Sequence, residues 1–268
     1  MEEHSIPRNK CKITFLGTGT SSGVPQIGCS CKVCTSNDPR DRRMRCSSLV
    51  EVNGTRILID CGPDFYFQML KIQFGQINGV LVTHEHYDHV GGLDDLRPFC
   101  RFGTINIYGN GVTLKHLHDR IPYCFKEHLY RGVPHLNLVE VTPHKEFSIN
   151  GVNVIPLRVM HGNMEILGYR IGRMAYITDM TSASPDELEF LSGVELLVVN
   201  ALRHTYHPTH QTVEQALDFA QKVGSQNTYL IHMSHDLGLH ATEEALLPEN
   251  VHFAYDGLEL FFDPKRIC

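Results

Sequence analysis

Four side chains of metal-binding type stand within six consecutive positions of the sequence, directly after the apolar segment Gly79–Val82. They are His84, His86, Asp88 and His89. Residues two apart in an extended segment project to the same side, so the first three face one way, and a turn toward the next helix brings His89 round to a neighbouring point. Imidazole and carboxylate ligands suit Zn, Mn or Fe and leave the ions acidic enough to activate water. The spacing predicts a site for two adjacent metal ions at a strand end, where α/β folds place their chemistry.

Three cysteines form a second cluster, Cys29, Cys31 and Cys34, within six residues. This spacing can wrap one tetrahedral zinc ion, and a closed structural site needs a fourth ligand. Cys46, Cys61 or a distant histidine could supply it. The odd total of 9 cysteines indicates thiols or metal ligands in a chain without an export signal, where a disulfide framework is not expected.

Composition limits the class of protein. The chain has 268 residues, with 24 Lys+Arg against 30 Asp+Glu and a net charge of −6, which argues against a general nucleic-acid binder. The composition excludes disordered and collagen-like classes. No apolar run reaches the roughly 18–20 residues that span a bilayer. The polar stretch Met1–Lys10 lacks the apolar core of a signal peptide. We therefore expect a cytoplasmic protein that does not contact membranes.

Short strands that alternate with helices must position these clusters. The expected strands are Lys12–Leu16, Ser47–Val52, Thr55–Ile59, Gly79–Thr83, Val152–Arg158, Ile166–Ile171, Arg173–Thr178, Val194–Val199, Thr228–Ile231 and Leu258–Phe262. The expected helices are Asp64–Phe74, Gly92–Arg101, Val112–Arg120, Ser184–Leu191 and Thr212–Val223. Asn53-Gly54, Asn150-Gly151 and Gly172-Arg173 are typical of hairpin turns. This order predicts an α/β sandwich of two similar halves around two sheets.

We expect a single domain over residues 1–268. The segment from about 104 to 146 has a less regular pattern, and we interpret it as an insertion that covers one edge and could act as a lid.

The motif over His84–His89 resembles the His-x-His-x-Asp-His signature of the metallo-β-lactamase superfamily. The resemblance covers most of the chain, because the remaining functional positions of that superfamily are matched in order, each after an apolar strand: Asp60, His161, Asp179 and His232. It implies a four-layer αβ/βα sandwich, with two mixed sheets flanked by helices. It also implies the ligands of two divalent ions (Zn or Mn): His84, His86 and His161 on one, Asp88, His89 and His232 on the other, and Asp179 between them. Asp60 would support the metal loop.

The Cys-x-Cys-x-x-Cys motif is similar to that of the phosphoribosyl 1,2-cyclic phosphate phosphodiesterase branch of this superfamily. In that branch the three cysteines hold a structural zinc together with a histidine three residues after the last active-site ligand, which matches His235. The glycine-rich segment Gly17–Pro25 lacks the Gly-Lys-Ser/Thr ending of a P-loop. We interpret it as a tight turn that brings the cysteines toward the metal centre.

The resemblance also implies catalytic roles for His210 and Asp88, with His210 acting on the leaving group as an acid that works near neutral pH. His207, Arg203 and Arg97 are candidate contacts for the substrate phosphate. The implied function is hydrolysis of a small anionic phosphodiester, such as phosphoribosyl 1,2-cyclic phosphate or a nucleoside 2′,3′-cyclic phosphate. A homodimer is compatible with this expectation.

Three alternatives stay open. A tRNA 3′-processing endonuclease shares the metal ligands, but it needs a basic surface and a tRNA-clamping arm that this sequence does not suggest. A thioester or lactam hydrolase of the same superfamily is allowed by Asp88 and Asp179. A non-catalytic carrier similar to coenzyme PQQ synthesis protein B would be favoured only by an incomplete ligand set, and here the set is complete.

Overall fold

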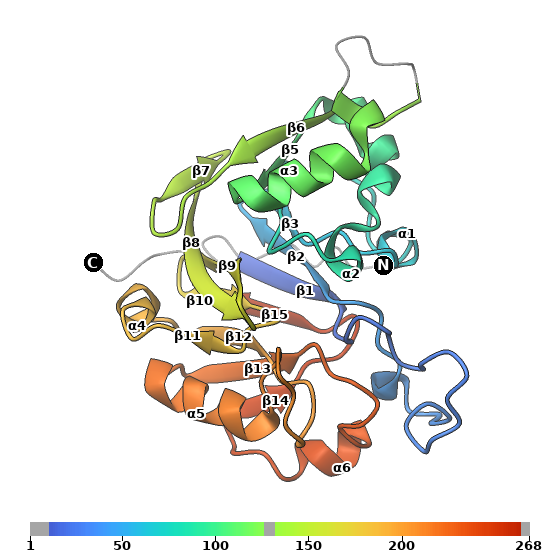
Figure 1. Ribbon diagram of the computed structural model, residues 1–268, viewed down its shortest axis with the longest axis vertical. Coiled ribbons are helices and arrows are strands. Elements are labelled where there is room, and N and C mark those ends of the chain that lie inside the picture. The colour runs from blue at the N-terminus through green and yellow to red at the C-terminus, as the bar shows by residue number, and fades with distance from the viewer. Residues whose placement is uncertain (1–10, 126–131, 264–268) are drawn as a thin grey trace.

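The computed structural model describes residues 11–125 and 132–263, so the polar N-terminal stretch Met1–Lys10 and the expectation drawn from it lie outside the described residues. Figure 1 shows two sheets packed face to face with helices on their outer sides. This is the four-layer sandwich expected from the sequence. No helix in the described part of the chain is long and apolar enough to cross a membrane.

The first sheet, as far as the described residues show, has seven strands. β1 pairs with β15 and β2, and β2 pairs with β3, in antiparallel fashion, whereas the pairs from β3 to β6 are parallel. In spatial order the strands are β15 (Glu259–Phe262), β1 (Cys11–Gly17), β2 (Ser47–Val52), β3 (Thr55–Ile59), β4 (Gly79–Leu81), β5 (Ile105–Gly109) and β6 (Leu136–Glu140).

The second sheet repeats this design. The pairs that involve β8 and the pair β9–β10 are antiparallel, and the pairs from β10 through β12 and β13 to β14 are parallel. In spatial order the strands are β11 (Ser182–Ala183), β8 (Val152–His161), β9 (Met164–Ile171), β10 (Met174–Ile177), β12 (Leu196–Asn200), β13 (Asn227–Ile231) and β14 (Val251–Phe253), and β7 (Phe147–Ile149) pairs with β8. Both sheets are therefore mixed.

Alternation along the buried strands separates an inner core from two outer ones. In β3, Ile57 faces the core shared by the two sheets, and Leu58 faces outward with Phe65 of α1. In β12, Val198 faces inward and Leu197 packs outward under α5. The helices are α1 (Phe65–Met69), α2 (Tyr87–Val90), α3 (Gly111–Arg120), α4 (Glu187–Leu191), α5 (Val213–Val223) and α6 (His240–Glu244), with 3₁₀ turns η1 (Pro39–Asp41), η2 (Leu93–Phe102) and η3 (Pro122–Phe125). Strands buried on both faces explain the continuous apolar runs in the sequence.

Within the segment from about 104 to 146, β5 and β6 extend the first sheet in parallel register, and α3 packs Leu114 and Leu117 onto its outer core. A role of this segment as a lid stays a prediction. One expectation needs correction. The helix expected over Gly92–Arg101 is a 3₁₀ helix, and Pro98 in its interior removes a backbone donor that an α-helix would use.

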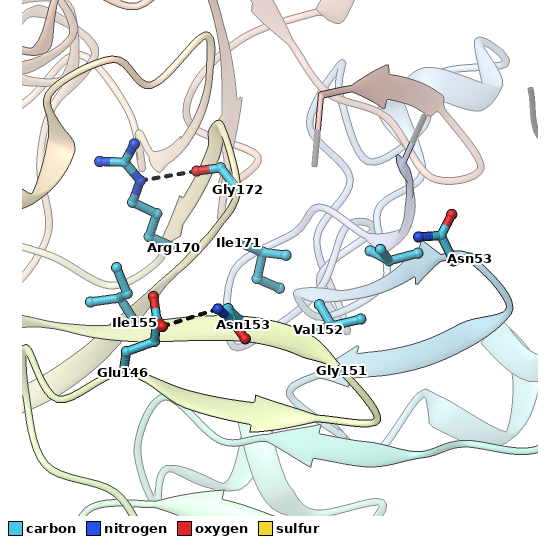
Figure 2. Close-up of a pocket in the computed structure, with 10 residues that line it drawn as sticks. Asn53, Glu146, Gly151, Val152, Asn153, Ile155, Arg170, Ile171 and Gly172 are labelled. Atoms are coloured by element: carbon cyan, nitrogen blue, oxygen red, sulfur yellow. Dashed lines mark hydrogen bonds between the residues drawn. The ribbon is translucent and has the colours of Figure 1, made fainter. Parts of the chain in front are cut away.

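The three hairpin turns lie at one end of the sandwich. There they line a small pocket of about 230 Å³, which Figure 2 shows with its Glu146–Asn153 and Arg170–Gly172 hydrogen bonds. β3, β8 and β10 all start at this end. Their carboxyl ends, which lead to the predicted metal-binding residues, therefore meet at the opposite end of the sheets.

Candidate metal centre

The predicted site residues follow the carboxyl ends of strands from both sheets. Asp60 follows β3, Asp179 follows β10 and His232 follows β13. These three residues have positive φ angles of 58°, 56° and 59°, a left-handed conformation that costs a residue with a side chain on the order of 1–3 kcal/mol. Strain of this kind persists where the surrounding structure requires one side-chain direction, and here it turns all three side chains toward one place.

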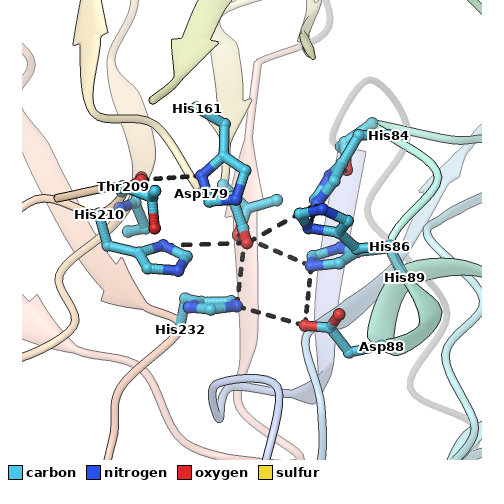
Figure 3. A network of polar contacts seen from close by, with 12 residues as sticks. His84, His86, Asp88, His89, His161, Asp179, Thr209, His210 and His232 are labelled. Carbon is cyan, nitrogen blue, oxygen red and sulfur yellow. Dashed lines mark hydrogen bonds and ion pairs between the residues drawn. The ribbon is translucent and has the colours of Figure 1, made fainter. Parts of the chain in front are cut away.

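One group of candidate ligands consists of His84, His86 and His161, whose nitrogens lie within 4.8 Å of one another. His84 Nε2 and His86 Nδ1 are 3.0 Å apart. Figure 3 shows the three rings converging from the loop after β4 and from the end of β8.

A second group consists of Asp88, His89, Asp179 and His232, and all four residues are buried. His89 Nε2 lies 3.2 Å from Asp88 Oδ2 and 3.3 Å from Asp179 Oδ1. His232 Nε2 lies 3.2 Å from the same Asp179 oxygen. Two imidazoles and two carboxylates thus surround one point.

Asp179 is common to both groups. Its Oδ1 atom faces His89 and His232, whereas its Oδ2 atom lies 3.9 Å from His84 Nε2. A carboxylate that offers one oxygen to each of two neighbouring ligand groups has the geometry of a bridging ligand.

Hydrogen bonds on the outer side of the rings fix their orientation. His89 Nδ1 donates to Asp60 Oδ2 at 2.7 Å, and His161 Nδ1 donates to the Thr209 carbonyl at 2.8 Å. Thr83 Oγ1 donates to Asp60 and lies 3.0 Å from His84 Nδ1. These contacts hold the outer nitrogens, so the inner nitrogens of the rings face the centre, which is how metal-binding histidines are oriented.

Charges in the site favour a cation at its centre. Burial lowers the pKa of His84 well below its ordinary value, so the neutral ring is favoured. Burial also lowers the pKa of His89, but the carboxylates of Asp179 and Asp88 outweigh it and raise that pKa well above its ordinary value. For Asp179, burial raises the pKa, but the rings of His232 and His89 outweigh it and hold the pKa well below its usual range.

Two further observations indicate that these side chains fit divalent ions. His89 Nε2 and His232 Nε2 are buried and, among the described residues, have no hydrogen-bond partner. The donor set is imidazole and carboxylate, which suits Zn, Mn and Fe. Unpaired buried nitrogens that face carboxylate oxygens are explained by a cation between them.

His210 lies at the edge of both groups. Its Nδ1 atom is buried without a hydrogen-bond partner and lies 3.9 Å from Asp179 Oδ2, and its ring is 4.8 Å from the rings of both His161 and His232. Burial, followed by the charge of His232, lowers the pKa of His210 to about 3. His207 lies next to it, with ring centroids 5.0 Å apart.

The cysteine cluster forms with the histidine that the family resemblance implied. Cys29, Cys31, Cys34 and His235 place their ligand atoms within 4.8 Å of one another, and His235 Nδ1 is 3.4 Å from two of the sulfurs. A hydrogen bond from the Cys34 N–H, followed by the contact with His235, lowers the pKa of Cys31 to about 6. Three thiols and one imidazole fit a closed tetrahedral zinc site. The eight cysteines in the described part of the chain form no disulfide.

The glycine-rich turn joins the two sites. Thr20 N donates to the Met233 carbonyl at 3.1 Å, directly after His232. A Cβ on Gly19 would lie 2.7 Å from the Arg43 carbonyl, so glycine permits this close approach.

The two candidate arginines are already paired with protein groups. Arg97 contacts Asp94, which also accepts a hydrogen bond from the Tyr123 hydroxyl at 2.8 Å. Arg203 lies 3.1 Å from Asp236 and donates to two carbonyls of its own loop. Their contact with substrate stays a prediction.

Sequence reasoning missed Thr83 and Thr209. The hydroxyl of Thr83 precedes the metal motif and could have been suspected. Thr209 acts through its backbone carbonyl, which carries no residue-type signal.

Comparison with known proteins identifies relatives of this chain. The family model described as the beta-lactamase superfamily domain matches residues 55–233. A solved structure described as a new diphosphatase from the PhnP family is 39% identical, with a TM-score of 0.89 over 96% of this chain and 98% of that one. Zn²⁺-bound PqqB from Methylobacterium extorquens, at 20% identity and a TM-score of 0.76 over 93% of this chain and 99% of that one, shares the fold.

A protein of Porphyromonas gingivalis (strain ATCC BAA-308 / W83) named octanoyltransferase is 46% identical over 255 residues, which are 94% of this chain and 52% of that protein. The chain spans about half the length of this relative. With two thirds of its length matched by the family model, the chain belongs to the beta-lactamase superfamily domain family and has the fold of the metallo-β-lactamase hydrolases.

Proposed function

We propose that this protein is a dinuclear-metal hydrolase that cleaves a phosphoric ester bond in a small anionic substrate. The observation that carries the proposal is the Asp179 carboxylate, which offers one oxygen to each of two adjacent ligand groups. Divalent ions bound there would supply Lewis acidity toward phosphoryl oxygens and lower the pKa of water. Zinc or manganese suits the ligands of the centre, and zinc suits the cysteine cluster.

The chain's own residues would divide the remaining work. His84, His86 and His161 would hold one ion, Asp88, His89 and His232 the other, and Asp179 both. His210 faces the centre with an unpaired nitrogen and an exposed side-chain fraction of 11%, so it can reach a bound substrate. The negative charge of a phosphoryl group would raise the pKa of His210 from about 3, and a proton on its ring could then pass to the leaving oxygen.

A ribose cyclic phosphate is the preferred substrate class, because the cysteine motif resembles that of the phosphoribosyl 1,2-cyclic phosphate phosphodiesterase branch. A diphosphate is the second candidate, and it is supported by the PhnP-family diphosphatase that is similar over nearly the whole chain. Both substrates are small phosphate compounds whose cleavage passes through similar charge at phosphorus.

The test is a substrate panel with quantified metals. Wild-type protein and Asp179→Ala are assayed against phosphoribosyl 1,2-cyclic phosphate, a nucleoside 2′,3′-cyclic phosphate, a nucleoside diphosphate, a generic aryl diester, precursor tRNA and an octanoyl thioester. Asp218→Ala, at an exposed position of α5, is the matched control. We expect wild type and control to cleave one of the small phosphates, and Asp179→Ala to lose metal and activity together. Cleavage of the thioester alone would replace the proposal with acyl hydrolysis.

A further inference from the structure

The loop of residues 203–210 connects β12 to α5 and closes at its base. Leu202 N donates to the Gln211 carbonyl at 3.0 Å, and Val213 N donates to the Arg203 carbonyl at 3.1 Å. Figure 1 shows the part of the chain between β12 and α5 in the lower half of the molecule. Within the loop, His210 faces the metal centre.

The loop also fixes a candidate metal ligand that belongs to another strand. The Thr209 carbonyl accepts hydrogen bonds from His161 Nδ1 at 2.8 Å and from Thr181 Oγ1 at 2.7 Å (Figure 3 shows the first). Thr181 Oγ1 in turn accepts from Gly162 N at 2.8 Å, next to His161. A shift of Thr209 would therefore turn the His161 ring as well as move His210.

The Arg203 side chain connects the loop to a carboxylate outside it. Its guanidinium donates to the carbonyls of Thr205 at 3.3 Å and Tyr206 at 3.4 Å, and to Asp236 Oδ2 at 3.1 Å. The anchor at Asp236 lies outside the loop, in the segment after β13. Without it, Arg203 would bind only its own loop and could not fix the loop's position relative to the rest of the molecule.

Asp236 belongs to the segment of residues 232–236, which contacts the metal centre, the cysteine cluster and the base of the loop. His232 in this segment faces the metal centre, and His235 contacts the sulfurs of Cys29 and Cys31 at 3.4 Å. Asp236 N donates to Ser234 Oγ at 3.2 Å, and Ser234 N donates to the Leu202 carbonyl at 3.0 Å, at the base of the loop. A change at the cysteine cluster that orders this segment therefore also orders Asp236, which anchors the Arg203 side chain.

We propose that Asp236 and Arg203 are positioning residues that couple the cysteine cluster to the metal centre through the loop of residues 203–210. An exposed ion pair contributes little to global stability, so this coupling leaves the free energy of unfolding nearly unchanged. Outer partners of metal-binding histidines, by contrast, change metal affinity or activity by roughly 10–100-fold when they are altered. The inference rests on the proposed metal centre but not on the identity of its substrate.

The experiment compares Asp236→Asn and Arg203→Gln with two matched variants. Asp218→Asn is the control for an exposed carboxylate, and Asp236→Glu keeps the charge. Affinity of the centre for Zn²⁺ is measured by competition with a chromophoric chelator, loop order by hydrogen exchange of residues 203–209, and catalysis by separate kcat and KM.

For Asp236→Asn we expect about 3–10-fold weaker binding of one of the two ions, faster exchange in the loop and lower kcat at unchanged KM. The unfolding midpoint should stay at its wild-type value. Asp236→Glu should restore metal affinity. Arg203→Gln should weaken metal binding and accelerate loop exchange in the same way, by about 10-fold or more.

A mutant cycle tests the coupling itself. Cys31→Ser should accelerate loop exchange in the wild-type background and much less in Asp236→Asn. Additive effects in the cycle, or an Asp236→Asn variant with the metal affinity and exchange of Asp218→Asn, would overturn the inference. Metal affinity and exchange need no substrate, so an inactive wild type that shows these shifts would refute the proposed function alone. If Cys31→Ser does not fold, the comparison of Asp236→Asn with Asp236→Glu still decides.

Discussion

At the scale of single residues, the metal centre depends on where ring nitrogens keep their protons. Asp60, Thr83 and Thr209 occupy the outer nitrogens of three histidines, directly or through a hydroxyl, so that the inner nitrogens converge. The left-handed backbone at Asp179 and His232 turns the remaining ligands toward the same place. Each side chain is thus oriented before any ion binds, which reduces the entropy lost on binding.

His210 provides the sharpest test of a single side chain. His210 places a ring nitrogen within 4.8 Å of ligand atoms of His161 and Asp179, but the family resemblance assigns it to the leaving group and not to the ions, so His210→Ala should retain full metal content. Its turnover should fall by about 10²–10⁴-fold, the usual contribution of a positioned acid or base. Elemental analysis and kcat on the preferred substrate check both statements. Turnover near the wild-type value in a fully metallated variant would remove His210 from the reaction.

At the scale of elements, strand ends were the most predictable part of the structure. Apolar runs such as Val194–Val199 and the turns Asn53-Gly54 and Asn150-Gly151 lead to β12 and to hairpins as expected. Apolar strands followed by His or Asp indicated where the chemistry would lie.

Other elements carried too little signal. In β5 and β6 the apolar residues are interrupted by Asn106 and Asn137, so neither strand forms a continuous apolar run, and the segment from about 104 to 146 carries a weak strand signal. The bonds of the loop from 203 to 210 run to backbone carbonyls and to distant carboxylates. Neither kind of contact is visible in residue types along the chain.

The loop should also respond to pH through His204. The His204 ring donates hydrogen bonds to Glu214 and to Glu243, each at 2.9 Å, and these bonds raise the pKa of His204 above its ordinary value although partial burial opposes them. A raised pKa means stabilisation that is fully present below about pH 6.5 and is lost as the pH rises through the folded value.

Hydrogen exchange of residues 203–209, corrected for intrinsic rates, should therefore show weaker protection at pH 8 than at pH 6 in wild type. His204→Gln should lose this difference, and His118→Gln, at an exposed position of α3, should keep it. Equal pH dependence in all three proteins would show that His204 does not hold the loop.

At the scale of the whole molecule, a buried polar network ties the N-terminal and C-terminal segments together. Asp256 accepts hydrogen bonds from Thr18 and Met44, and Arg43 donates to the Ala254 carbonyl at 2.8 Å and to His240 Nδ1 at 3.0 Å. Protonation of a member of this network would leave buried charges unpaired. We therefore expect the fold to lose stability in acid.

His240 is one of two titrating members of this network, because burial also raises the pKa of Asp256 to about 6. Burial, followed by the charge of Arg43, lowers the pKa of His240 from 6.5 to about 4. A lowered pKa means stability that is present above about pH 6.5 and is lost as the pH falls through about 4, worth on the order of 3 kcal/mol. Urea unfolding at pH 7 and pH 4 should show this loss in wild type and in His118→Gln, and a smaller loss in His240→Gln. The same loss in His240→Gln would assign the acid sensitivity to other groups.

The central claim is that one chain holds a pair of divalent ions bridged by Asp179, and a separate ion at the cysteine cluster. Crystals of the zinc-loaded protein, measured on both sides of the zinc absorption edge, test it directly. We expect two anomalous peaks between the rings of His161 and His232, with Asp179 contacting both, and one peak between Cys29, Cys31, Cys34 and His235. A single peak at the centre, or a pair without contact to Asp179, would contradict the dinuclear account.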